Sequence, residues 1–226
     1  RGAYGQALVS SSLPAVLTAL RALNAEPPLK DTLDLNRLIL AGHSAGGVMA
    51  LMNAHRHLLP GVVAAISFFG NPLATTSLAG DAFTKGELPR LADNLPLLII
   101  GGTDDGVSQH HNQIYGRPDC TSTDITLATL HEGIDVQNQP SNRLDRYAVV
   151  IEGASHYSIA DPLDTTIGRT YLDNVPTLDR AECRRLLTEL TARFISEHVI
   201  DTGNDETSSF ADWLAAAPHI AALTVI

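Results

Sequence analysis

The chain has 226 residues, of which 44% are hydrophobic and 18% are charged, a length and composition suited to one domain with a sizeable core. Fifteen basic residues against 25 acidic ones give a net charge of −10, and no basic cluster is present that could hold a phosphate backbone, so nucleic acid is excluded as a partner. The longest apolar runs fall far short of the roughly 20 residues that a membrane helix needs, and we expect a soluble protein.

The first part of the chain predicts a helix, a strand and a second helix. The chain starts at Arg1 and shows no signal-peptide pattern, which suggests that an upstream part has been removed or left out. Apolar residues recur every three or four positions over residues 7–23, as in an amphipathic helix. Residues 37–41 form a short apolar run typical of a strand, and residues 46–59 have the pattern of a buried helix.

Further apolar runs predict a parallel sheet. Residues 62–69, 96–100 and 147–151 are apolar almost throughout, as in strands that are buried on both faces. Residues 181–199 show a clear amphipathic helical pattern. Such strands alternating with helices indicate the α/β class, with a mostly parallel, doubly wound sheet. A polar connector over residues 201–209 leads to an apolar segment, residues 210–226, for which we expect a terminal helix that covers an apolar patch of the body; docking on a partner is the alternative.

The five residues Gly42-His43-Ser44-Ala45-Gly46 fit the pattern G-x-S-x-G between a predicted strand and a predicted helix. A nucleophile elbow stands in that context, because the tight turn lifts the serine hydroxyl above the sheet edge. We expect Gly42 and Gly46 to be required because side chains there would collide with the strand and helix, and Gly47 to permit close packing of the helix. The backbone N–H of Ala45 is the candidate oxyanion donor. The competing interpretation of Ser44 is an ordinary helix N-cap.

A serine hydroxyl becomes a good nucleophile only when a base takes its proton and an acid orients that base. The strand over residues 96–100 runs into Asp104 and Asp105, and the strand over residues 147–151 runs into His156. Ser44, Asp105 and His156 thus follow predicted strands in the order nucleophile, acid, base. The alternatives are a turn aspartate, since Asp-Gly is a common turn, and a structural histidine.

These motifs resemble the α/β-hydrolase superfamily over roughly residues 5–200. Gly42 to Gly47, the Gly102-Thr-Asp-Asp105 spacing and the stretch from Glu152 to Ser158 are similar to serine esterases of the lipase-like, dienelactone-hydrolase-like and platelet-activating-factor-acetylhydrolase-like branches. The resemblance implies Ser44 as nucleophile, His156 as base and Asp105, rather than Asp104, as acid. Dienelactone hydrolases proper use a cysteine nucleophile, so their substrates are not implied here.

The resemblance also implies a part of the sheet that this chain does not show. Family members place about four strands ahead of the elbow strand, and the loop after the third supplies a second oxyanion N–H. Only 36 residues precede residue 37 here, and they predict one helix. We therefore expect residues 1–200 to be the C-terminal portion of a catalytic domain that lacks the N-terminal half of its sheet. A separate chain or segment is expected to complete it.

Together these observations predict a serine hydrolase that cleaves carboxylic esters of small-molecule or lipid-like type through an acyl-enzyme. No cofactor and no metal are expected. A peptidase or lactonase with the same triad, and a catalytically silent binding protein of the same fold, are the alternatives. Cys120 and Cys183 are either a bridged pair or two inert thiols. Two pairs of histidines lack the further ligands that a metal site needs: His55 with His57, and His110 with His111.

Overall fold

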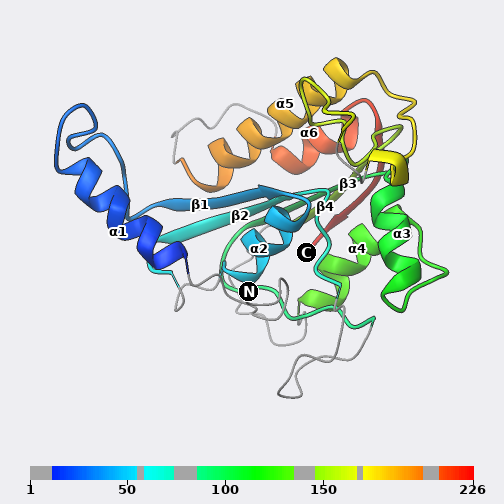
Figure 1. Cartoon of the computed structure of the whole chain (residues 1–226), viewed down its shortest axis with the longest axis horizontal. Helices are drawn as coiled ribbons and strands as arrows, with labels where there is room; N and C mark the ends of the chain where they lie inside the picture. The colour runs from blue at the N-terminus through cyan, green and yellow to red at the C-terminus, as the bar shows by residue number, and fades with distance from the viewer. Residues whose placement is uncertain (1–11, 55–58, 74–85, 135–145, 167–169, 201–208) are drawn as a thin grey trace.

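The computed structural model describes residues 12–54, 59–73, 86–134, 146–166, 170–200 and 209–226. Over these residues the chain forms a five-stranded sheet with helices on both faces (Figure 1), which confirms the predicted α/β class. The sheet order is β1-β2-β3-β4-β5, with β1 to β4 parallel and β5 antiparallel to β4. The strands are β1 (Leu38–His43), β2 (Val62–Phe68), β3 (Leu97–Gly102), β4 (Arg146–Ile151) and β5 (Ile220–Val225).

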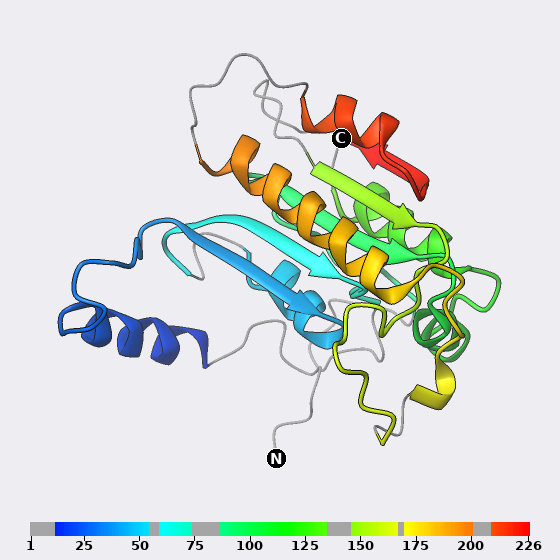
Figure 2. The same cartoon turned by 90° about the horizontal axis from the view of Figure 1, so that it is seen from above.

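The sheet separates two apolar cores, one on each face. Helices α5 and α6 cover one face and helices α2 and α4 cover the other, as Figures 1 and 2 show from two directions. Successive strand residues alternate between the cores: Leu98 packs with α5, and Leu97 lies on the opposite side. The helices are α1 (Leu13–Asn24), α2 (Ala45–Met52), α3 (Gly106–Ile114), α4 (Ser122–Gly133), the 3-10 turn η2 (Thr170–Leu172), α5 (Arg180–His198) and α6 (Phe210–Ala216).

The predicted elements appear close to their expected positions, with differences at their ends. The helix predicted over residues 46–59 ends at Met52, where the Asn53 side chain donates a hydrogen bond to the carbonyl oxygen of Met49 at 2.8 Å. The helix predicted from residue 7 is seen from Leu13 onward, and residues 7–11 lie outside the described residues. Two crossover helices, α3 and α4, lie between β3 and β4 in the chain.

The C-terminal segment differs from the single terminal helix that we expected. Helix α6 ends at Ala216, before Pro218, which cannot continue a helical hydrogen-bond ladder, and β5 then pairs antiparallel with β4. The Phe210 side chain is buried, and its ring centroid lies 4.7 Å from that of Tyr147. The segment therefore docks on the body both as a helix and as the sheet's last strand.

The two edge strands of the sheet, β1 and β5, are less buried than the strands between them. Strands β3 and β4 are buried at every position, whereas every residue of β1 is half-buried or exposed. Within the described residues β1 pairs with β2 alone. The apolar β1 residues Leu38, Ile39 and Leu40 thus lie at an open parallel edge.

Cys120 and Cys183 are both free thiols, so the bridged alternative is wrong. Burial raises the pKa of the Cys183 thiol to about 11, which keeps it protonated at neutral pH. Among the described helices none combines the length and apolar character needed to cross a membrane.

Candidate active site

The carboxyl ends of β1, β2, β3 and β4 meet along one edge of the sheet. In the register of the ladder, His43 lies beside Phe68, Phe68 beside Ile100, and Ile100 beside Val149. The turns that follow β1, β3 and β4 carry Ser44, Asp105 and His156. Parallel strands therefore bring together three residues that are separated by up to 112 positions in the chain.

The three side chains form one continuous hydrogen-bonded chain. Nδ1 of His156 lies 2.9 Å from Oδ2 of Asp105, and Nε2 lies 2.8 Å from the hydroxyl oxygen of Ser44. Since a carboxylate can only accept, Nδ1 carries the proton and donates it to Asp105. The unprotonated Nε2 then accepts the hydrogen bond of the Ser44 hydroxyl. Asp105 and His156 are each 2% exposed, so water competes little for either contact.

Ser44 occupies the turn between β1 and α2 in a disfavoured backbone conformation. Its φ of 56° and ψ of −122° are rare for a residue with a side chain. It stands at the N-cap of α2, yet its side chain makes no capping hydrogen bond. The competing N-cap interpretation therefore does not describe this serine. Ala45, the first residue of α2, has an N–H that no carbonyl within the helix accepts.

The glycines of the turn have unequal roles. A Cβ at Gly42 would lie 2.3 Å from the carbonyl carbon of Gly46, and one at Gly47 would lie 2.3 Å from the hydroxyl of Ser67, so both positions require glycine. A Cβ at Gly46 would meet no atom of the described residues within 4 Å. The expectation of a collision at Gly46 is wrong, because this exposed helical position points away from the strand.

Asp105 both caps α3 and contacts His156. Its Oδ1 accepts the N–H of Ser108 at 2.7 Å, and its Oδ2 accepts the Ser108 hydroxyl at 2.8 Å in addition to the imidazole. The carboxylate is thus held by three donors in a buried setting. Sequence reasoning missed Ser108, although a serine at the third helical position after an aspartate N-cap is a local signal for such a pair.

Asp104, the weaker candidate for the acid, points elsewhere. Its Oδ2 accepts both the N–H and the hydroxyl of Thr177, at 3.0 and 2.8 Å, on the exposed side of the loop. The Asp104 N–H donates to the carbonyl of Ala154, and a Cβ at Gly102 would come 2.1 Å from that same oxygen. Gly102 therefore allows the turns after β3 and β4 to come into contact, and Asp104 binds Thr177 on the exposed side of this contact.

His43 contacts the backbone of the candidate base. Its Nε2 lies 2.8 Å from the carbonyl oxygen of His156, and because a carbonyl only accepts, Nε2 carries a proton. Burial, followed by repulsion from His156, lowers the pKa of His43 and favours its neutral form. The ring of Tyr157 lies 5.1 Å from the imidazole of His156 and 6.0 Å from that of His43. The sequence pattern marked His43 only as a variable motif position.

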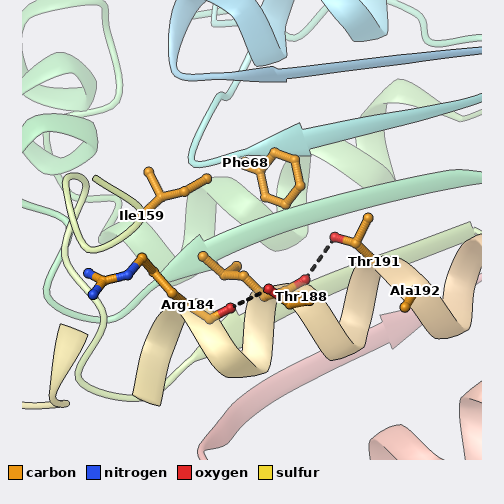
Figure 3. Close-up of a pocket in the computed structure, with 7 residues that line it drawn as sticks. Phe68, Ile159, Arg184, Thr188, Thr191 and Ala192 are labelled. Carbon is orange, nitrogen blue, oxygen red and sulfur yellow. Dashed lines mark hydrogen bonds between the residues drawn. The ribbon is translucent and has the colours of Figure 1, made fainter. Parts of the chain in front are cut away.

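An open groove of about 460 Å³ lies beside the site on the α5 face, between the end of β2, the loop after His156 and α5 (Figure 3). Its walls are mostly apolar, with Phe68 and Ile159 on one side and Leu187 on α5. None of the three hydrogen-bonded site residues lines this groove.

In the parts of the chain that the structure describes, no three His, Cys, Asp or Glu residues are grouped as metal ligands would be. His55 and His57 lie outside the described residues. An imidazole that accepts a hydrogen bond from a hydroxyl and donates one to a buried carboxylate is suited to general-base chemistry.

In comparisons with known proteins, no family model and no curated sequence matches this chain.

Proposed function

We propose that the protein is a serine hydrolase of the α/β-hydrolase type that cleaves carboxylic esters through an acyl-enzyme. The observation that carries the proposal is the hydrogen-bonded chain from Ser44 through His156 to Asp105, with Ser44 in a strained turn that withholds its hydroxyl from helix capping. A hydroxyl, an imidazole and a buried carboxylate in this order are the parts that nucleophilic acyl transfer needs.

In the proposed reaction, the Ser44 oxygen attacks the ester carbonyl carbon while His156 Nε2 takes the hydroxyl proton. The carbonyl π electrons move to the oxygen, which the Ala45 N–H stabilises at the start of α2. When the carbon–oxygen bond to the alcohol breaks, His156 returns the proton to the leaving alcohol. Water then attacks the acyl carbon and gives one proton to His156. When this second tetrahedral intermediate collapses, the bond from the acyl carbon to the Ser44 oxygen breaks, His156 returns the proton to that oxygen, and the acid product leaves. Asp105 keeps the imidazole in the required tautomer throughout.

The proposal includes strands beside β1 that come from a separate chain or segment. Two observations support such strands: the half-buried edge of β1, and the apolar groove between the end of β2 and α5. An apolar edge strand without a partner is a template for pairing with another strand. Such a segment would supply the second oxyanion N–H. Loss of one oxyanion donor typically lowers turnover about 100- to 1000-fold, so an assay on this chain alone needs matching sensitivity.

The test is hydrolysis of short-chain p-nitrophenyl esters and the matching p-nitroanilides by the purified chain and by Ser44→Ala. The esters are expected to be hydrolysed faster than the anilides, and the variant to lose turnover by more than about 10⁴-fold with an unchanged melting temperature. Faster cleavage of the anilides would favour the peptidase alternative. Retention of ester hydrolysis by Ser44→Ala would refute Ser44 as the nucleophile.

A further inference from the structure

Asp173, which follows the 3-10 turn η2, binds the backbones of both turns that hold the acid and the base. Its Oδ1 accepts the N–H of His156 at 3.1 Å and the N–H of Gly106 at 3.2 Å. Its Oδ2 accepts the N–H of Tyr157 at 3.0 Å. One carboxylate thus joins the residue immediately after Asp105 to the candidate base and its neighbour.

The segment around Asp173 is packed directly on the acid turn. A Cβ at Gly106 would lie 2.5 Å from the carbonyl oxygen of Leu172 and 2.7 Å from the backbone nitrogen of Asn174. Glycine at position 106 therefore lets the segment approach closely enough for Asp173 to reach both turns. This close approach is a second observation, independent of the hydrogen bonds, that places residues 172–174 against the turn that carries the acid.

Asp173 does not compete with Asp105 for the imidazole. Its oxygens bind backbone N–H groups of His156 and Tyr157, whereas the ring Nδ1 of His156 binds Asp105. Hydrogen bonds from N–H groups to an ionised carboxylate are stronger than those to a neutral acceptor, so the contact holds the backbone firmly. Its effect on the imidazole is exerted through the position of the chain.

We infer that Asp173 is a positioning residue that holds the Asp105 and His156 turns at the separation the triad requires. The inference rests on the proposed hydrolase function. A misplacement of about 1 Å between reacting groups can lower a rate about 100-fold. Loosening this link should therefore slow the chemical step while leaving the binding of substrate nearly unchanged.

The variant Asp173→Asn keeps the size of the side chain and removes one acceptor. An amide offers one carbonyl oxygen, and its NH₂ group cannot accept. Either Tyr157, or else Gly106 and His156 together with Asn174, therefore lose their acceptor. The matched control is Asp164→Asn on the same loop. Asp164 is exposed, and among the described residues it accepts hydrogen bonds from Thr166 alone.

The experiment compares the chain, Asp173→Asn and Asp164→Asn in three measurements: the rate of fluorophosphonate labelling at Ser44, kcat and KM for an ester, and the downfield proton resonance of the His156–Asp105 hydrogen bond. We expect Asp173→Asn to label about 10- to 100-fold more slowly per folded molecule. Its kcat should fall with KM within about twofold, and the proton resonance should shift or broaden. The control should match the parent chain.

The outcomes separate the inference from the function on which it rests. An unlabelled parent chain would refute both. A labelled parent and an Asp173→Asn variant with the parent's labelling rate and resonance would refute the inference alone, even if the variant melts at a lower temperature. If Asp173→Asn does not fold, Gly106→Ala, which pushes residues 172–174 away while keeping the carboxylate, is expected to give the same loss of kcat, and an unchanged kcat would refute the inference.

Discussion

The turns that carry Ser44 and Asp105 occupy equivalent places and use their side chains differently. Each follows a parallel strand and places its residue at the N-cap of the next helix. Asp105 has a φ of −71° and caps α3 through Ser108. Ser44 has a φ of 56° and caps nothing, so its hydroxyl is directed to His156. At the same position in a strand–turn–helix unit, Asp105 thus caps its helix and contacts His156 together, whereas the strained backbone of Ser44 leaves its hydroxyl in contact with His156 and out of the cap.

The largest expected effect comes from the pair Asp105→Asn and Asp104→Asn. In the first variant an amide NH₂ faces Nδ1 of His156 and favours the wrong tautomer, for which we expect a fall in kcat of about 10⁴-fold. In the second, the lost contact is to Thr177 on the exposed side of the loop, and kcat should stay within about threefold. Ester hydrolysis by both variants checks this, and equal losses would remove the distinction between the two aspartates.

The second effect concerns the glycines that make the Ser44 turn possible. Gly42→Ala forces a Cβ against the backbone of Gly46, and we expect it to lower the free energy of unfolding by about 3 kcal/mol or more. Gly46→Ala meets open space in a helix and should raise that free energy by up to about 1 kcal/mol. Urea denaturation measures both. A harmless Gly42→Ala would show that the turn is looser than its contacts indicate.

The smallest effect is at Ser108, which belongs to the Asp105 turn alone. Ser108→Ala removes the hydroxyl bond to Oδ2 and leaves the N–H bond to Oδ1 in place. We expect the loss of this hydrogen bond, which orients Asp105, to raise the activation free energy by about 1 kcal/mol, and kcat to fall about fivefold. The kinetics of Ser108→Ala are the measurement, and a loss as large as that of Asp105→Asn would mean that the hydroxyl has a more direct part in the chemistry.

Local pattern predicted much of the fold and the principal site residues. Continuous apolar runs located β1 to β4, and motifs at their carboxyl ends marked Ser44, Asp105 and His156, because parallel strands deliver their following turns to one edge. The antiparallel β5 escaped prediction because residues 210–226 are mostly apolar and suggest one helix, although Pro218 is a local signal that the helix ends before the strand begins.

The contacts that support the site could not be predicted in the same way. Asp173 reaches Gly106 across 67 positions, and His43 reaches the His156 carbonyl across 113. The periodicity of a sequence does not indicate which distant backbone groups a side chain will contact. The glycine at position 46 shows the opposite error, because a motif implied a steric requirement that the structure does not contain.

The most direct test of the central claim is fluorophosphonate labelling of the purified chain, followed by mass spectrometry to locate the adduct. The proposed triad predicts one adduct on Ser44, absent from Ser44→Ala and strongly reduced in His156→Ala, because the hydroxyl needs the imidazole as its base. An adduct on another residue, or labelling of Ser44 that is unaffected by His156→Ala, would contradict it.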